Sequence, residues 1–329
     1  MAHGSGGKAS HDLIQEVFAA AFDNPFLGAL GDSAILPVGG GSLAFTTDTY
    51  VVKPPFFPGG DIGRLAVAGT VNDLAVMGAA PRFLSCGFVL EEALPLDTLR
   101  KVVGSMKSTA DEAGVQIVAG DTKVVERGAA DQIFINTCGV GELQSTRRLS
   151  DTPIRAGDRV LVSGTIGDHG AAVLCCREGL QFESEMVSDC APLSGLIRLM
   201  LEGCDGIKFM RDPTRGGLAT TLNEIVRGGP LGIILEEASI PVRDDVASFC
   251  EILGLDPLYV ANEGKVVAVV EGGQAEGLCQ IMRAHPLGRE ASIIGEVVTN
   301  PAGRVGLKTA VGGTRVVDML VGDQLPRIC

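Results

Sequence analysis

One stretch constrains the fold more than any other. It runs from Leu65 to Met77, reads Leu-Ala-Val-Ala-Gly-Thr-Val-Asn-Asp-Leu-Ala-Val-Met, and is apolar almost all round. A helix of this kind is buried on every side. The pattern predicts a helix that starts near Asp61, a suitable N-cap, and runs to about Met77, before Gly78. Asp73 lies inside it, and an unpaired buried carboxylate costs several kcal/mol. Asp73 therefore needs a cation or dense hydrogen bonding.

Three more acids occupy apolar surroundings. Asp48 interrupts the strand predicted over 45–51, Asp121 ends the apolar strand predicted over 117–121, and Asp32 precedes an apolar strand. Any one of them could be an ordinary cap or turn acid. As a set, Asp32, Asp48, Asp73 and Asp121 predict a hard-cation site, since Mg²⁺ prefers oxygen ligands and usually accompanies phosphates. The chain has no Walker A, G-x-G-x-x-G or kinase signature, so a nucleotide would be held by a different fold.

Charge and cysteine content exclude several classes of protein. The net charge of −13 argues against a nucleic-acid partner, because such proteins normally carry a basic face. There is no apolar run of transmembrane length and no signal peptide, so we expect a cytoplasmic protein without a membrane partner. The nine cysteines are odd in number and lack C-x-x-C pairs, which indicates neither a disulfide scaffold nor a zinc site.

Strands and helices alternate along both halves of the chain, which predicts an α+β fold in two parts joined near 144–158. In the first half we expect an amphipathic helix over 11–22, two strands within 34–52, strands over 83–90, 115–119 and 132–140, and a helix over 96–113. In the second half we expect strands over 159–163, 231–235, 265–270 and within 292–317, and helices near 168–178, 191–202, 217–227, 244–253 and 274–284.

The last four residues are Pro326, Arg327, Ile328 and Cys329. Pro326 fixes its own φ and pushes the preceding residue toward extended geometry, so this end resembles a short, stiff arm with a thiol at its tip. Prenylation is excluded, because the cysteine is not four residues from the end. The plain alternative is a frayed terminus without a role.

Several motifs together resemble the superfamily of aminoimidazole ribonucleotide synthetase, which includes selenophosphate synthetase and thiamine-monophosphate kinase. They are Gly31–Ala34, Thr46–Asp48, Asn72–Gly78 and Gly120–Lys123 in the first half, and Ser163–Gly170, Arg211–Gly217 and Asn262–Lys265 in the second. Within it, the last three stretches and the Pro-Arg-Ile-Cys end resemble the HypE family of carbamoyl dehydratases, which act in hydrogenase maturation.

The resemblance implies a two-domain fold like that of aminoimidazole ribonucleotide synthetase, whose first half pairs strands across a homodimer. It implies an N-terminal segment and helix over 1–30, an ATP-binding domain over 31–145, an α/β domain over 156–317 and a flexible tail over 318–329. It also implies that ATP and Mg²⁺ serve to dehydrate an S-carboxamide on Cys329 to an S-cyano group. A HypF-like carbamoyltransferase would load the thiol, and an iron-carrying HypC–HypD-like scaffold would accept the cyano group.

By the same resemblance, Lys123 and Glu263 join Cys329 as catalytic residues. The nucleotide-binding residues would be Asp48, Asn72, Asp73, Gly120, Asp121 and Asp212. From residues alone, Lys123 reads as a phosphate-binding lysine and Glu263 as a turn acid, and Asp212 is equally well a helix cap. We further expect the tail to have an inward state for dehydration and an outward state for loading and delivery. The rival functions are a sister ligase or kinase with a diffusible substrate, and a non-catalytic thiol carrier.

Overall fold

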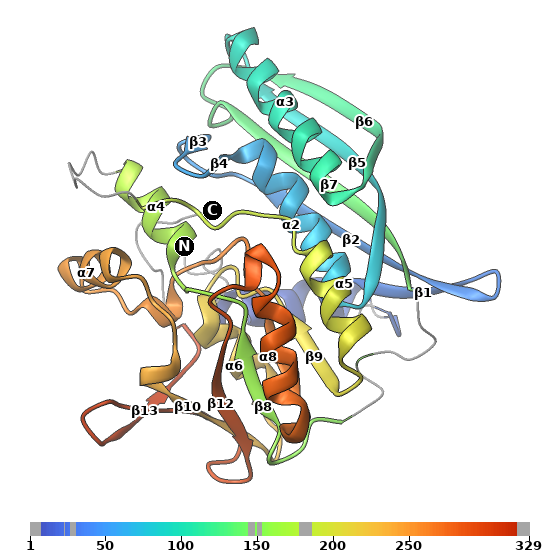
Figure 1. Cartoon of the computed structure of the whole chain (residues 1–329). Helices are drawn as coiled ribbons and strands as arrows, with labels where there is room; N and C mark the ends of the chain where they lie inside the picture. The colour runs from blue at the N-terminus through green and yellow to red at the C-terminus, as the bar shows by residue number, and fades with distance from the viewer. Residues whose placement is uncertain are drawn as a thin grey trace.

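The computed structural model describes residues 8–22, 24–26, 31–143, 149, 153–177 and 186–320. The first half is built on a five-stranded sheet in the order β1-β2-β7-β5-β6, with two helices on one face (Figure 1). Its strands are β1 (Ala34–Val38), β2 (Gly41–Tyr50), β5 (Ala79–Glu91), β6 (Gln116–Val125) and β7 (Ile133–Leu143); its helices are α2 (Ile62–Val76) and α3 (Leu96–Ala113); a small hairpin joins β3 (Phe56–Phe57) and β4 (Gly60–Asp61).

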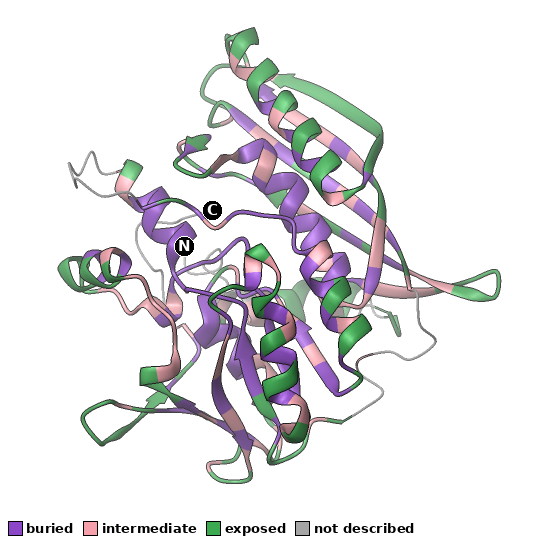
Figure 2. Cartoon of the chain, viewed as in Figure 1, coloured by how far each residue is buried: buried purple, intermediate pink, exposed green. Residues whose placement is uncertain are grey.

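Helix α2 is the buried helix that the sequence predicts. Asp61 caps it, since one of its carboxylate oxygens accepts hydrogen bonds from the backbone N–H groups of Gly63 and Arg64 at 2.7 and 2.9 Å. Every residue of the helix except Arg64 and Asp73 is buried (Figure 2). It packs against the first sheet and α3, and its last turn also joins the hydrophobic core of the second half. Asp73 is therefore held between the two halves.

The second half is a seven-stranded sheet, in the order β14-β13-β10-β12-β8-β11-β9, with helices on both faces. Helices α5 and α8 pack on one face and α6 on the other. Its strands are β8 (Arg159–Val162), β9 (Ile207–Arg211), β10 (Gly232–Glu236), β11 (Val267–Val270), β12 (Ser292–Val298), β13 (Val305–Lys308) and β14 (Thr314–Val317); its helices are α4 (Asp168–Arg177), α5 (Ser194–Gly203), α6 (Gly217–Val226), α7 (Asp244–Leu253) and α8 (Ala275–Arg283).

Several strands differ from the sequence prediction: the short β3 and β4 were not predicted, and β9 and β6 differ for identifiable reasons. Strand β9 was not predicted, because charged residues interrupt its apolar pattern; the buried Lys208 is neutralised there by Asp158, 2.7 Å away. Strand β6 is longer than predicted, because it pairs with β5 as far as Val125. Asp121 consequently lies in the middle of a strand and not at its end.

The described part of the chain begins with a helix that the sequence also predicts. It runs as α1 (Lys8–Leu13) into a π-helical stretch, Ile14–Ala19, and ends near Ala21. No helix in the described ranges has both the length and the apolar character that crossing a bilayer requires. Eight of the nine cysteines lie in the described part of the chain, and all eight are free thiols.

Candidate active site

Four carboxylates from distant parts of the sequence gather between the two halves. Asp32 comes just before β1, Asp48 from β2, Asp73 from α2, and Asp212 directly after β9. Their mutual influence shows their proximity, because Asp212, Asp32 and Asp48 each raise the pKa of Asp73, after burial as the largest cause. The structure thus brings together three of the four predicted metal ligands, and adds Asp212. We call these four residues the acid cluster.

Asp73 is at the centre of the acid cluster. Its carboxylate accepts a hydrogen bond from the Thr46 hydroxyl at 3.0 Å, and its backbone carbonyl accepts one from the Ser33 hydroxyl at 2.9 Å. Burial and the three neighbouring acids raise the pKa of Asp73 well above its ordinary value. Burying several carboxylates together without a counter-charge is costly, so the cluster favours the binding of a cation.

The charges of Asp32 and Asp212 are neutralised to different extents. Arg211 donates from Nε and Nη2 to Asp32 at 2.7 Å, and it also pairs with Glu224. Burial nevertheless raises the pKa of Asp32, against the opposing effect of Arg211. For Asp212, burial and then Asp32 raise the pKa to about 7. Of the two readings that the sequence leaves open for Asp212, its burial among other acids favours a site residue.

Glu263 lies beside the acid cluster in a buried loop. Burial, followed by Asp212, raises the pKa of Glu263 well above its usual range, and Arg215 opposes the shift. The loop is fixed by Asp189, whose carboxylate accepts hydrogen bonds from the N–H groups of Glu263 and Gly264 at 3.1 and 3.2 Å. A carboxyl group with a raised pKa and a fixed backbone has the properties of a general acid or base.

Asn72 and Gly120, which are predicted to bind the nucleotide, both have contacts that support the fold. The Asn72 side chain donates to the carbonyls of Ala191 and Glu263, and it accepts from the N–H of Leu193 at 2.7 Å. It thereby joins α2 to the second half. At Gly120, a Cβ atom would approach the Cys86 carbonyl oxygen to 2.7 Å, so glycine permits the close pairing of β6 with β5.

Asp121 and Lys123 are not part of the acid cluster within one chain. Their side chains form an ion pair at 2.8 Å and are 71% and 70% exposed. They do share one face of β6, as the sequence predicts, but it is the sheet face opposite α2. This follows from the register, because residues directly opposite each other in neighbouring strands point to the same side. The register aligns Asp121 with Gly87, then Asn136, then Thr49 across the sheet, so Asp121 and Thr49 point to the same side. The neighbours of Thr49 in β2, Asp48 and Tyr50, point to the opposite side, where the Tyr50 hydroxyl lies 3.4 Å from the Thr70 hydroxyl of α2.

The donor set of the acid cluster fits a hard divalent cation in its chemistry, since all its ligands are carboxylate oxygens. In the described part of the chain, no three His, Cys, Asp or Glu side chains are already close enough to hold a metal ion. Asp32 is turned toward Arg211 and Asp73 toward Thr46. Cys329, the predicted carrier of the substrate, lies outside the described residues.

Sequence reasoning missed Asp189 and the roles of two arginines. Asp189 lies in Ser188-Asp189-Cys190-Ala191, where an acid again stands among buried residues. That is the signal that identified Asp73, so Asp189 could have been found in the same way. Arg211 and Arg215 stand in a motif that the sequence singled out. Asp32, which pairs with Arg211, is distant in sequence and could not be identified as its partner.

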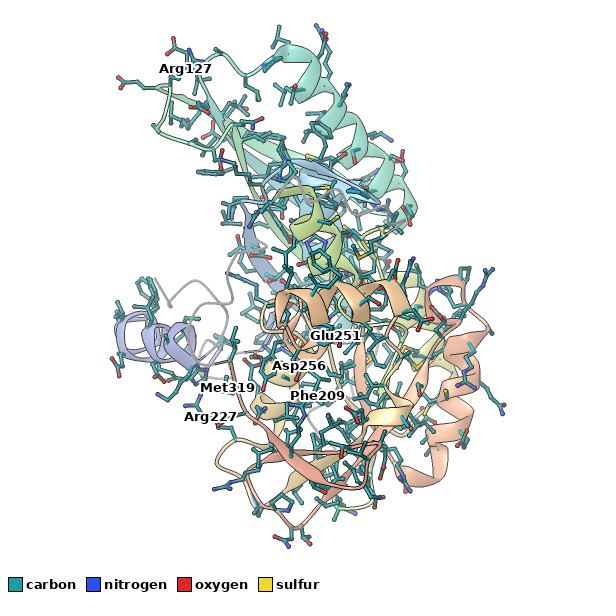
Figure 3. All side chains as sticks on the ribbon, turned by 90° about the vertical axis from the view of Figure 1, so that its left-hand side faces the viewer. Arg127, Phe209, Arg227, Glu251, Asp256 and Met319 are labelled. Atoms are coloured by element: carbon teal, nitrogen blue, oxygen red, sulfur yellow. The ribbon has the colours of Figure 1, made fainter. Side chains whose placement is uncertain are left out.

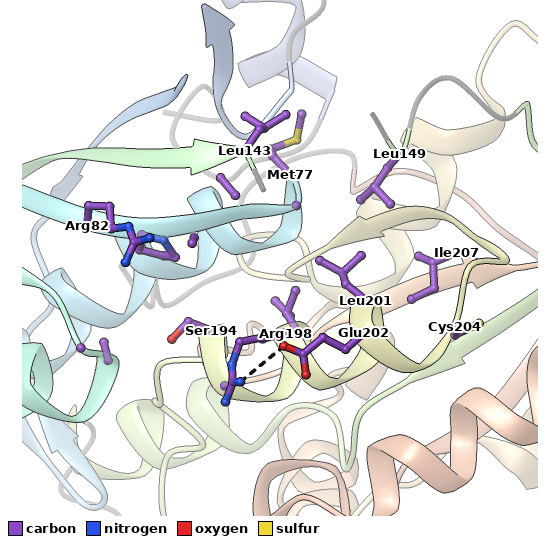
Figure 4. Close-up of a pocket in the computed structure, with 18 of the residues that line it drawn as sticks. Met77, Arg82, Leu143, Leu149, Ser194, Arg198, Leu201, Glu202, Cys204 and Ile207 are labelled. Carbon is purple, nitrogen blue, oxygen red and sulfur yellow. Dashed lines mark hydrogen bonds and ion pairs between the residues drawn. The ribbon is translucent and has the colours of Figure 1, made fainter. Parts of the chain in front are cut away.

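A cavity of about 530 Å³ lies between α5, the start of β5 and the end of α3 (Figure 4). Met77, Leu149, Leu201 and Ile207 contribute apolar walls, and Arg198 and Glu202 pair at its edge. None of the sequence-predicted site residues lines it. Its position therefore does not support the predicted chemistry.

Comparisons with known proteins agree with the fold. Residues 30–143 match the N-terminal domain of the AIR synthase related proteins, and residues 155–308 match the C-terminal domain. The chain is 52% identical to the carbamoyl dehydratase HypE of Azotobacter vinelandii, over its full length and 96% of that relative.

Two solved structures are also similar over nearly the whole chain. One is described as HypE in complex with ATP; it has a TM-score of 0.84 and 50% identity, and the match covers 99% of this chain and 98% of that one. The other is described as a HypE–HypF complex; it has a TM-score of 0.88 and 50% identity, and the match covers 94% of this chain and 99% of that one.

Proposed function

The chain belongs to the HypE family of carbamoyl dehydratases, within the AIR synthase related proteins, and we propose that it uses ATP to dehydrate a carbamoyl group carried on its own Cys329. The product is an S-cyano group, which supplies the cyanide ligand of iron in nickel–iron hydrogenase. The observation that carries this proposal is the acid cluster at the junction of the two halves, with Glu263 beside it.

The acid cluster suits phosphoryl transfer. That reaction depends mostly on positioning and on neutralising charge, for which buried acids and a divalent cation serve. Asp32, Asp48, Asp73 and Asp212 would hold Mg²⁺, and the bound ion supplies charge neutralisation for the ATP phosphates. The raised pKa of Asp73 and of Asp212 fits this role, because a cation would stabilise the ionised carboxylates that burial alone disfavours.

The chemistry balances as the loss of one water. The oxygen of the carbamoyl group carried by Cys329 attacks the γ-phosphorus of ATP and ADP leaves, while one N–H proton is lost and the C=N bond forms. Cleavage of the C–O bond then releases phosphate, the second N–H proton leaves, and the C≡N bond is complete. Glu263 is suited to accept a proton, because its raised pKa gives its carboxylate a high proton affinity.

Lys123, the other residue proposed for proton transfer, can reach the site only if a second copy of the chain takes part. It lies with Asp121 on the sheet face opposite α2, so it does not point toward Glu263 of its own chain. Strand β6 is an edge strand, and its exposed apolar residues Ile117, Val118 and Val124 are suited to burial against another chain. We therefore propose a homodimer formed over β6, in which Asp121 and Lys123 of one copy complete the site of the other.

The proposed partners follow from the substrate. A thiol must first receive a carbamoyl group, which requires a carbamoyltransferase of the HypF type. The finished cyano group must pass to iron on a scaffold of the HypC–HypD type. The relative solved as a HypE–HypF complex supports the first of these partners. We propose that the reaction takes place in the cytoplasm.

Mass spectrometry of the C-terminal peptide tests the proposal. Protein carbamoylated on Cys329 is incubated with ATP and Mg²⁺, and the peptide should lose the mass of one water as phosphate is released. A control without Mg²⁺, and the variant Cys329→Ser treated in the same way, should show no loss. ATP turnover on a free metabolite by a chain that lacks Cys329 would instead show that the protein is a ligase or kinase with a diffusible substrate.

A further inference from the structure

The N-terminal helix, residues 8–21, presents an apolar face to solvent. Ile14, Val17, Phe18 and Phe22, at or just past its end, are 43%, 51%, 48% and 63% exposed. Their spacing of three and four residues places them along one side of the helix. We call these four residues the helix face. A continuous apolar surface of this kind is unusual on a protein monomer and marks a place where something binds.

The helix face lies beside the point where the C-terminal tail leaves the fold. The N–H of Lys8 donates to the carbonyl of Leu320 at 3.2 Å. Arg227 lies 3.8 Å from Asp12 of the helix, and it also contacts the sulfur of Met319 at 3.7 Å. Figure 3 shows the helix, in pale blue, projecting from the body beside Met319 and Arg227. The start of the helix is thus fixed to Met319 and Leu320, which directly precede residues 321–329.

The tail has the length and composition to cover the helix face. Residues 321–329 can extend about 30 Å, whereas the fourteen residues of the helix span about 21 Å. The apolar residues of the tail are Val321, Leu325, Pro326 and Ile328, and its one cation is Arg327.

We propose that residues 321–329 dock along the helix face when they are not in the active site, with Cys329 near Phe22. The helix would then be a specific resting place for the tail, with its root held at Leu320. This proposal deepens the proposed function by giving the outward state of the tail a defined partner within the same chain. It concerns only the position of the tail, so it can be tested without a carbamoyl donor and without ATP.

Disulfide trapping tests the position of Cys329. The variant Phe22→Cys places a thiol at the expected end of the tail, and Glu16→Cys places one on another side of the same helix. Under mild oxidation without nucleotide, we expect Cys329 to join Cys at position 22 at least about ten times faster than Cys at position 16, as measured by mass spectrometry of the linked peptides. Equal rates, or no link in either variant, would overturn the proposal.

Alkylation of the native thiol gives a second measurement. Phe18→Asp puts a charge on the helix face, and Gln15→Asp adds the same charge beside it as a matched control. We expect iodoacetamide to label Cys329 several-fold faster in Phe18→Asp than in Gln15→Asp. If Phe18→Asp instead lowers the mass of an oligomer in sedimentation and leaves Cys329 labelling unchanged, a second copy covers the helix face and the proposal is wrong. Unchanged labelling with weaker binding of the carbamoyltransferase would equally overturn it, in favour of that partner.

Discussion

The acid cluster and the Asp121–Lys123 pair consist of similar residues in opposite surroundings. Burial raises the pKa of Asp73 well above its ordinary value, and three further acids add to the shift. The hydrogen bond from Lys123 lowers the pKa of Asp121, whose side chain is mostly exposed. The four acids of the cluster lie between the two halves of the chain, whereas Asp121 lies on an edge strand that is exposed to solvent.

This difference separates a site that one chain builds from a site that needs another chain. The acid cluster has its walls already, because α2, β2 and the segment after β9 enclose it. The Asp121–Lys123 pair lies on β6 with no other described element packed over it, since nearly all of β6 is exposed in the single chain. Buried charge acts strongly and exposed charge weakly, so each region should respond to mutation in its own way.

The largest effect is expected at the centre of the acid cluster. Asp73→Asn should lower turnover of carbamoylated protein by about 10²–10³-fold, the range for loss of a well-placed electrostatic group. The metal-free variant should melt higher than the parent protein at neutral pH, because a neutral amide removes repulsion among buried acids. Phosphate release and thermal melting measure the two effects.

Asp97→Asn is the control for this change, because Asp97 is an exposed acid of α3 paired with Arg100. It should leave both turnover and melting as they are. Turnover above a tenth of the parent value in Asp73→Asn would mean that the buried acids are structural, and the contrast between the two regions would lose its functional meaning.

Complementation tests whether the exposed pair becomes part of a site. Lys123→Ala and Glu263→Gln should each be inactive alone. If Lys123 serves the other copy, a 1:1 mixture should recover about a quarter of the parent turnover, because half of the dimers are mixed and each carries one intact site. The measurement is phosphate release after the two variants exchange subunits. A mixture that stays inactive, with exchange shown by mass, would contradict the shared site.

The buried region was the more predictable of the two. An all-round apolar helix is buried in any fold, so Asp73 could be identified from the residues around it, and the bounds of α3 are those that the sequence predicts. The neighbours of Asp212 could not be identified, since Asp32 and Asp48 are more than 160 residues away along the chain. Local pattern could only leave Asp212 as a cap or a site residue.

The exposed region was less predictable for a physical reason. Ile117, Val118 and Ala119 read as an apolar strand, which suggests burial for Asp121 as well. Whether such a strand is buried depends on what packs against it, and that information is not local. In the single chain nothing described covers β6, so Asp121 is exposed even though its sequence context resembles that of Asp48. Its role in metal binding therefore stays a prediction.

The smallest expected effect is on the pH dependence of thermal stability, which should change for a variant in the acid cluster but not for one in the exposed pair. The pKa of Asp212 is about 7 in the folded chain against an ordinary 3.8, so this group favours folding below pH 3.8 and stops doing so as pH rises through about 7. With chelator and without nucleotide, Asp212→Asn should melt like the parent protein at about pH 4 and a few degrees higher at about pH 7.5. Asp121→Asn, the exposed counterpart, should show no such gain, because the pKa of Asp121 is lowered and its ionised form is the favoured one. Thermal melts of the three proteins across this range decide the matter, and equal curves for both variants would show that burial does not distinguish the two regions.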